Sequence, residues 1–352
     1  MSEISAYTVT PRKAREGVVD CLQAGLVPYL HSSPGMGKSA IMRSVAKDAG
    51  LLLIDHRLST SPPEDLSGLP RFNDRGRAEF APFSDLFPLD DDPIPKDHAG
   101  WMIFLDEFSS ARKETQAAAY KLILDKMTGQ RKLNPMSFIT AAGNLMSDRA
   151  IVNPMGTAMQ SRVIHLEMVV SFDEWLEDVA YKENWDTRII AFLSQFPSKL
   201  MDFKPDHKEK TFCCPRTWEF MQKFLAAGIN PSSDKAALFS GTITGAIALE
   251  FIEFTRVFEH IVKVADIMTD PANCQLPRDT PTQWATVATM MEKLTATTVD
   301  NFCIYADRFD LPFRIMFYRS LMVRQPKLRD HPAFRRATVA LAKYLNPAYH
   351  GL

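Results

Sequence analysis

The chain of 352 residues has few cysteines and almost no net charge. A formal net charge of -1 provides no general attraction to nucleic acid or to an anionic membrane. The five cysteines are odd in number and lack the spacing of metal ligands, which argues against a disulfide scaffold and a zinc site and favours a reducing compartment. They are Cys21, Cys213, Cys214, Cys274 and Cys303.

Long apolar runs are also missing. No stretch approaches the roughly 20 apolar residues that span a bilayer, and the polar N-terminus has no signal-peptide pattern. We therefore expect a cytoplasmic protein without membrane association. Hydrophobic residues make up 46% of the chain and charged residues 24%, which is ordinary for a globular protein, and the length allows more than one domain.

The most informative stretch surrounds Lys38. Residues 31–40 are rich in glycine and serine, follow the apolar run 27–30 and precede a helix-like run at 41–49, which is the context of a phosphate-binding loop. Glycines there let successive N–H groups face phosphates, and the new helix adds its positive end. Lys38 is predicted to reach the β- and γ-phosphates of a nucleotide and Ser39 to hold Mg²⁺. The other predicted nucleotide contacts are Pro34, Gly35, Met36, Gly37 and Ala40.

Two acids follow an apolar strand at residues 101–107. In open α/β sheets, ligands bind at the carboxyl ends of the strands. Asp106 is predicted to support Mg²⁺, directly or through water, and Glu107 to orient and deprotonate an attacking water. The alternative is that Asp106 caps the next helix and Glu107 is a solvated acid. Asn144 ends another short strand and either positions that water beside Glu107 or forms a local turn.

Other segments predict the surroundings of these motifs. A helix capped by Thr10 is expected over 10–26, and a buried strand over 51–55. The long insertion 59–100 contains a predicted hairpin tip at 71–77, with Gly76 in a position that needs a positive φ. Six apolar residues of the insertion are expected to anchor it: Leu66, Leu69, Phe72, Phe80, Phe83 and Phe87.

Taken in order, residues 33–39, 105–107 and 142–144 resemble the corresponding motifs of AAA+ ATPases, and within them those of the MoxR-like group. Asp106 and Glu107 resemble the Walker B pair, and Asn144 the sensor 1 residue. The insertion 59–100 is similar in place to the helix-2 insert of that clade. The resemblance covers roughly residues 10–228.

The resemblance also implies roles for two arginines. Arg162 corresponds to the arginine finger, which reaches into the nucleotide site of a neighbouring subunit, and Arg149 is a second candidate for that contact. Arg216, at the start of a predicted helix, corresponds to the sensor 2 arginine of the lid. From the residues alone, Arg162 could also be a solvated surface arginine, and Arg216 a salt-bridge partner.

The predicted fold class is α/β: an AAA+ P-loop domain with a parallel sheet over 1–168, a helical lid over 169–230 and a helical C-terminal extension over 231–352. The resemblance implies Mg²⁺-dependent hydrolysis of ATP by a homo-oligomeric ring, with six subunits expected. It further implies remodelling of a protein partner, with a von Willebrand factor A domain protein as the partner class.

Two other functions remain open from the sequence. A nucleic-acid motor or loader would use the basic stretch 314–336, although a solvated helical face is the plainer interpretation of that stretch. A nucleotide-dependent scaffold with little turnover is the third, against which the intact Asp106 and Glu107 argue. Phe251, Phe254 and Phe258 recur at helical spacing and predict a core stripe.

Overall fold

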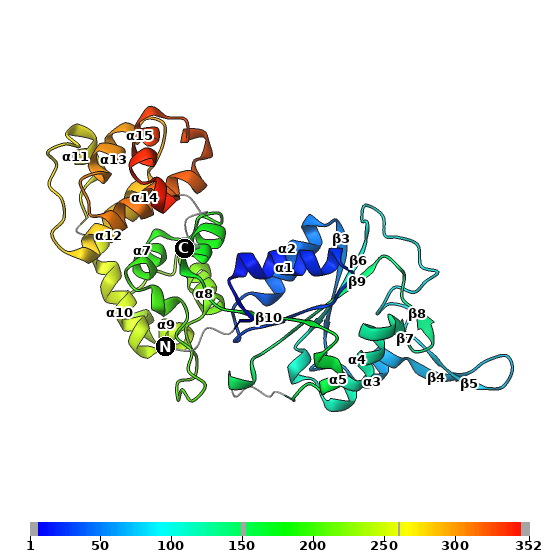
Figure 1. The fold of residues 1–352 in the computed structure, drawn as a ribbon. Coiled ribbons are helices and arrows are strands. Elements are labelled where there is room, and N and C mark those ends of the chain that lie inside the picture. Colours follow the sequence, from blue (N-terminus) through cyan, green and yellow to red (C-terminus); the bar gives the residue numbers. More distant parts are fainter. Residues whose placement is uncertain (1–5, 149–152, 260, 346–352) are drawn as a thin grey trace. The chain divides into compact units, whose positions relative to one another are not determined.

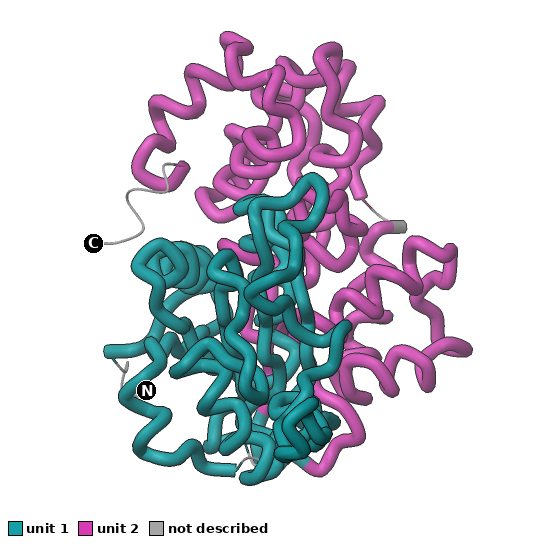
Figure 2. The backbone as a smooth tube through the Cα atoms, turned by 90° about the vertical axis from the view of Figure 1, so that its right-hand side faces the viewer, with its two compact units in different colours: residues 1–171, 204–207 teal, residues 172–203, 208–352 magenta. Residues whose placement is uncertain are grey.

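The structure is a computed structural model that describes residues 6–148, 153–259 and 261–345. The chain forms two compact units, which are drawn in different colours in Figure 2. Unit 1 comprises residues 1–171 and 204–207, and unit 2 comprises residues 172–203 and 208–352. Each unit is described by itself below.

Unit 1 is built on a parallel sheet of six strands, in the order β1-β10-β2-β9-β6-β3. The order of the strands in the sheet differs from their order in the sequence. Residues far apart in the sequence therefore meet at the carboxyl ends of the strands (Figure 1). The predicted α/β class is confirmed. The strands are β1 (Thr8–Val9), β2 (Pro28–His31), β3 (Leu51–Arg57), β6 (Gly100–Asp106), β9 (Ser137–Gly143) and β10 (Ile164–Met168).

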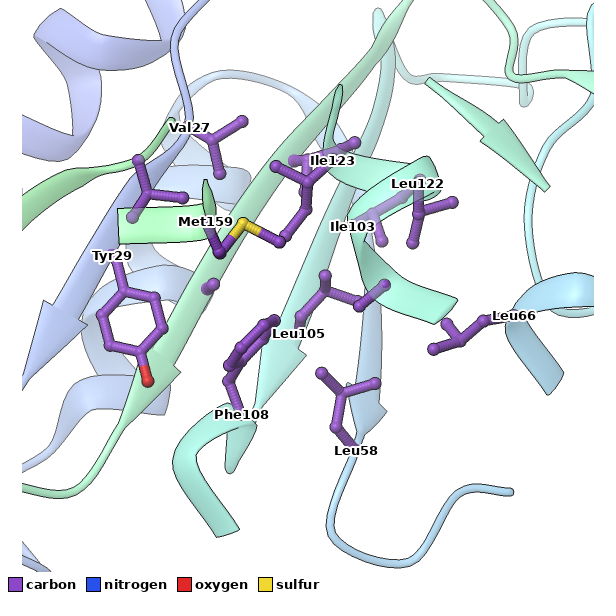
Figure 3. Packing of buried hydrophobic residues seen from close by; sticks show 14 of the residues in the cluster. Val27, Tyr29, Leu58, Leu66, Ile103, Leu105, Phe108, Leu122, Ile123 and Met159 are labelled. Atoms are coloured by element: carbon purple, nitrogen blue, oxygen red, sulfur yellow. The ribbon is translucent and has the colours of Figure 1, made fainter. Parts of the chain in front are cut away.

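Helices cover both faces of this sheet, because the central strands are apolar on both sides. Met102 and Phe104 of β6 pack against α1 (Pro11–Gln23) and α2 (Lys38–Asp48) on one face. The alternate residues of β6 belong to the core of the opposite face, which includes α4 (Lys113–Asp125) and α5 (Thr157–Gln160) and is shown in Figure 3. Every residue of β6 is buried, so the strand that ends at Asp106 and leads into Glu107 is held in the core.

Two predicted elements differ in detail. Strand β3 is not fully buried: it pairs only with β6 at the edge of the sheet, and Leu52 is 38% exposed. The first helix ends at Gln23, and Gly25 follows with a φ of 70°. Thr10 occupies the predicted cap position, but its hydroxyl accepts no capping hydrogen bond from the helix. Its Oγ1 is buried without a partner among the described residues.

The insertion contains α3 (Pro63–Ser67) and the antiparallel hairpin of β4 (Leu69–Phe72) and β5 (Ala78–Ala81), which extends away from the sheet in Figure 1. Gly76 at the turn has a φ of 69°, as predicted. Leu66 and Phe87 are buried anchors, again as predicted. The anchor prediction is wrong for three apolar residues of the hairpin, which are 47–80% exposed. They are Leu69, Phe72 and Phe80.

A second, smaller hairpin lies just after α4. It consists of β7 (Met127–Thr128) and β8 (Arg131–Lys132), which pair antiparallel. Gly129 connects them with a φ of 56° and approaches the insertion closely, since a Cβ there would lie 2.7 Å from the Ser67 carbonyl oxygen. The hydroxyl of Thr128 donates to the Leu66 carbonyl at 2.9 Å. These contacts hold the root of the insertion against the α/β core.

Unit 2 is helical, as predicted. The phenylalanine stripe is part of its core, with Phe251 fully buried and Phe254 6% exposed. Both rings contact Phe192 edge-on. The boundary between a lid and an extension at residues 230 and 231 stays a prediction. The helices are α6 (Phe172–Trp175), α7 (Thr187–Gln195), α8 (Pro215–Ala226), α9 (Ala236–Ile243), α10 (Gly245–Arg256), α11 (Val264–Thr269), α12 (Thr280–Glu292), α13 (Val299–Ala306), α14 (Leu311–Arg324), α15 (Pro332–Ala340) and α16 (Ala342–Leu345).

The basic stretch 314–336 is a solvated face only in part: Lys327, Arg329, Arg335 and Arg336 are exposed, as predicted, whereas the other arginines are partly or fully buried. Arg319 is 8% exposed and donates to Asp173 at 3.0 Å and to the Tyr344 carbonyl. Burial lowers the pKa of Arg324, whose guanidinium donates to the Trp185 carbonyl. Three arginines of this stretch pair with carboxylates of unit 2: Arg314 with Asp307, Arg319 with Asp173, and Arg335 with Asp330, of which the last pair is exposed.

No helix among the described residues has the length and apolar character needed to cross a membrane. This finding concerns only the helices of the two units.

Candidate nucleotide-binding site

The phosphate loop connects the carboxyl end of β2 to the start of α2. Helix α2 begins at Lys38, three residues earlier than the sequence predicted. Gly35 and Gly37 have φ angles of 79° and 88°, a region that glycine adopts without a steric cost. Gly37 is the N-cap and provides no side-chain acceptor to the first turn. The backbone donors at the start of α2 are therefore uncapped by a side chain, which suits an anion.

Ser32 stands where such loops usually have their first glycine. It is not among the residues with positive φ, so a serine fits there without backbone strain. Lys38 Nζ donates to the Ser32 carbonyl and to Ser32 Oγ, both at 3.0 Å. The departure from glycine thus adds a polar contact that holds the lysine inside the loop.

Asn144 directly follows the neighbouring strand β9 and also contacts Lys38. Its Oδ1 accepts from Lys38 Nζ at 3.1 Å, and its backbone N–H donates to Ser109 Oγ at 2.8 Å. The structure therefore brings Asn144 to the phosphate loop as well as to the segment that follows Asp106.

Gly143 shows how tightly this part of the site is packed. A Cβ on Gly143 would lie 2.1 Å from Tyr29 Oη and 2.7 Å from Ser109 Oγ. Tyr29 is 1% exposed and Ser109 7% exposed, so neither side chain has space to retreat. Burial raises the pKa of Tyr29, which keeps its hydroxyl neutral. Neither Gly143 nor Ser109 was predicted from the sequence, because only the pairing of β2 with β9 brings Tyr29 beside them.

The two acids and Ser39 meet at the same edge of the sheet. Ser39 Oγ donates to Asp106 Oδ2 at 2.9 Å, and Asp106 Oδ1 accepts the Glu107 N–H at 2.8 Å. Asp106 is 8% exposed. A hydroxyl and a carboxylate that converge in this way are hard oxygen ligands, and they fit Mg²⁺.

Glu107 adopts an unusual backbone conformation for a residue with a side chain, with a φ of 55°. Its Oε2 accepts a hydrogen bond from the Ser59 hydroxyl. Ser59 follows β3, and the register that places Arg57 opposite Asp106 brings Ser59 beside Glu107. The sequence did not identify Ser59, since this contact depends on β3 and β6 being neighbours.

Asp148 is a further carboxylate at the loop that the sequence did not single out. It accepts from Ser33 Oγ at 3.2 Å and is 8% exposed. Burial is the main cause that raises its pKa, while Ser33 and the Lys38 charge act in the opposite direction. The first two serines of the loop are thus held by different partners, Ser32 by Lys38 and Ser33 by Asp148.

Arg162 lies at the amino ends of the parallel strands, whereas the phosphate loop lies at their carboxyl ends. The pairing of Ile164 with Pro28 and of Glu167 with His31 places the amino end of β10 beside the amino end of β2, whereas Lys38 follows the carboxyl end of β2. Arg162 is exposed, and its guanidinium donates to the Ala158 carbonyl of α5. Within one chain, Arg162 is therefore not part of the site formed by Lys38.

The structure does not place the other two predicted arginines at the site formed by Lys38. Arg216 is exposed in the first turn of α8 and belongs to unit 2. Arg149 lies outside the residues that the structure describes. The roles of all three arginines stay predictions.

No protein-family model matches the chain, and no curated protein matches it. Among solved structures, the chain is similar to a Cytophaga hutchinsonii protein assigned as an ATPase, with 12% identity and a TM-score of 0.37 over 97% of this chain and 91% of that one. It is also similar to NtrX from Brucella abortus, with 12% identity and a TM-score of 0.33 over 96% and 69% of the two chains.

A third similarity is to RuvB of Thermotoga maritima, a Holliday junction branch migration motor, with 14% identity and a TM-score of 0.36 over 72% of this chain and 76% of that one. Identities and TM-scores this low carry no information about function. The function of this chain is therefore argued from its own residues.

Proposed function

We propose that this chain is a Mg²⁺-dependent ATPase of the AAA+ type. The observation that carries this proposal is the convergence of Lys38, Ser39, Asp106, Glu107 and Asn144 at one edge of a parallel sheet, from three separate stretches of sequence. Two of these contacts, Lys38 to Asn144 and Ser39 to Asp106, join residues 106 and 67 positions apart. A chance glycine-rich turn would not be accompanied by this set of partners.

Ser39 and Asp106 are the residues that would hold Mg²⁺. When bound, the ion neutralises charge on the phosphate oxygens. The Ser39 hydroxyl and the Asp106 carboxylate already contact each other, so both ligands are oriented before the ion arrives. The Lys38 ammonium, held by Ser32 and Asn144, exchanges these oxygens for those of the β- and γ-phosphates.

Glu107 acts as the general base. Ser59 occupies one oxygen of its carboxylate, which leaves the other free to accept a proton from water. The water oxygen then attacks the γ-phosphorus, the bond to the β,γ-bridging oxygen breaks, and ADP and phosphate leave. Asn144, fixed by Ser109, is close enough to Lys38 to orient the γ-phosphate or the attacking water.

The remote position of Arg162 supports a site that is shared between subunits. Arg162 and its own Lys38 lie at opposite ends of the parallel strands. An arginine finger must therefore come from a neighbouring chain to complete the site. An arginine supplied in trans is worth about 10³–10⁵ in rate. We propose a closed ring, six subunits being the expected number, with Arg216 as the sensor 2 residue.

The biological role that we propose is remodelling of a protein partner, with the chain as a MoxR-like member of the AAA+ ATPases and a von Willebrand factor A domain protein as partner class. The support is the sequence resemblance together with the position and hairpin form of the insertion 59–100. A nucleic-acid motor is less well supported, since several arginines of the stretch 314–336 are buried or paired with carboxylates.

The experiment that tests the proposal measures ATP hydrolysis per chain against protein concentration, with mass by light scattering at each concentration. We expect a rate that climbs as the oligomer assembles. Neither Lys38→Ala nor Arg162→Ala alone should turn over ATP at the full rate, and a mixture of the two should recover activity. In that mixture, Lys38 of one variant meets Arg162 of the other.

Three results would count against the proposal. A rate independent of concentration from a monomer would exclude the shared site. Failure of the mixture to recover, with both variants still assembling, would exclude Arg162 as the finger. Strong stimulation by DNA that falls steeply with salt would favour the nucleic-acid motor.

A further inference from the structure

A pair of histidines links two strands of unit 1 at the start of the phosphate loop. His31 Nε2 lies 2.8 Å from His165 Nδ1, and the two rings stack at 5.1 Å with an angle of 24°. His31 is the last residue of β2, and His165 belongs to β10. Tyr29 packs against both rings, with its centroid 4.3 Å from that of His31.

The hydrogen bonds of this pair have a defined direction. His165 Nε2 lies 2.9 Å from the Gln160 carbonyl oxygen, which can only accept, so His165 carries its proton on Nε2. In the neutral ring, Nδ1 of His165 is then an acceptor, and His31 must donate from Nε2. Burial, then the neighbouring His165 and Lys38, lower the pKa of His31 to about 4, so His31 is neutral at pH 7.

The hydrogen-bonded path from His31 to Gln160 connects the surroundings of Lys38 with those of Arg162. Ser32, which follows His31 directly, holds the Lys38 ammonium through its carbonyl and its hydroxyl. Gln160 is the last residue of α5, and the Arg162 guanidinium donates to the Ala158 carbonyl of the same helix. The path from α5 to the phosphate loop lies entirely within unit 1.

We propose that His31 and His165 are positioning residues that tie the phosphate loop to the segment bearing Arg162. The affinity of a subunit for its own ATP then depends on whether its Arg162 is engaged by a neighbour. This inference rests on the proposed function, since it takes Arg162 to act in a neighbouring site. Movement of α5 on engagement shifts the Gln160 carbonyl. His165, which is bonded to that carbonyl, and then His31 follow the shift, and His31 moves Ser32 through the peptide bond between them.

The test compares nucleotide affinity in the dispersed and the assembled protein. A fluorescent ATP analogue is titrated into dilute and concentrated full-length chain, and light scattering reports assembly at both concentrations. For the wild type we expect the two dissociation constants to differ by about fivefold or more, the lower range of coupling between sites in proteins. His165→Phe keeps an aromatic ring beside Tyr29 but removes both hydrogen bonds, and should bring the ratio close to one.

Two further variants test the two hydrogen bonds of His165 one at a time. His165→Asn places an acceptor near the position of Nδ1, and His165→Gln places a donor near that of Nε2, so each variant restores one contact only. Both should reduce the ratio, and they remain informative if the Phe variant fails to fold. The matched control is His98→Phe, because His98 is an exposed histidine of the insertion whose Nδ1 lies 2.9 Å from the carbonyl oxygen of the nearby Lys96.

The outcomes distinguish this inference from the proposed function. A wild-type hydrolysis rate that does not depend on assembly overturns the proposed function. A rate that depends on assembly, combined with equal dissociation constants in dilute and concentrated wild type, overturns the positioning role. The same conclusion follows if His165→Phe assembles and keeps the wild-type ratio, since a merely structural pair would change thermal stability and leave the ratio intact.

Discussion

His31 makes the stability of unit 1 depend on pH in a way that can be worked out from the structure. In an unfolded chain its imidazole has a pKa near 6.5, and in the fold the pKa is about 4. Between these values the unfolded state binds a proton that the folded state does not. The contribution of His31 to stability is therefore complete above pH 6.5 and is lost as the pH falls towards 4.

The size of the effect follows from the two pKa values. Each pKa unit corresponds to about 1.4 kcal/mol, so the full contribution is roughly 3 kcal/mol. Between pH 7 and pH 5, which covers most of the window, the linkage relation gives a loss of roughly 2 kcal/mol. The groups that face His31 are His165 and the Lys38 ammonium, and both disfavour a charge on it.

The variant His31→Phe removes the titrating group and keeps a ring of similar size against Tyr29. Amide hydrogen exchange in peptides that contain β2 and β10 measures the opening free energy of unit 1 separately from that of unit 2. From pH 7 to pH 5, wild-type peptides should lose roughly 2 kcal/mol more protection energy than those of the variant. The His98→Phe protein serves as control and should behave as wild type.

Equal pH dependence in wild type and His31→Phe would refute this reasoning. It would mean that the imidazole of His31 is solvated enough to keep its ordinary pKa. A variant that is less stable at pH 7 by a constant amount would not affect the conclusion, because the prediction concerns the slope with pH.

Three further changes test the site. Glu107→Gln should reduce turnover by about 10²–10⁴ and leave the affinity for an ATP analogue intact, as phosphate release and equilibrium titration would show, and a variant with normal turnover would exclude Glu107 as the base. Ser59→Ala should lower kcat about fivefold with KM unchanged, since a hydrogen bond contributes about 1 kcal/mol, and an unaltered kcat would mean that Ser59 does not orient Glu107. Gly143→Ala should destabilise the protein by about 1–3 kcal/mol in urea unfolding, because its Cβ overlaps Tyr29 and Ser109, whereas Gly241→Ala, with open space around it, should be neutral or stabilising.

The sequence by itself determined the local elements and the chemistry of the main side chains. Gly35 and Gly37 predicted a loop that needs positive φ, and the apolar run before Asp106 predicted a central strand, because both signals are local. The order of the motifs predicted the α/β class. The exposed hairpin residues were the main error, because apolar character alone does not tell a buried anchor from an unpaired face.

Only the tertiary structure decided which residues meet. The order of the parallel strands puts Ser59 on Glu107 and Ser109 on Asn144, and it turns Gly143 from an ordinary small residue into one that no side chain can replace without a clash. The same order joins His31 to His165, and the parallel direction of β2 and β10 separates Arg162 from its own Lys38. Strand order depends on how distant segments pack into one core, and that information is spread over the whole chain rather than contained in any motif.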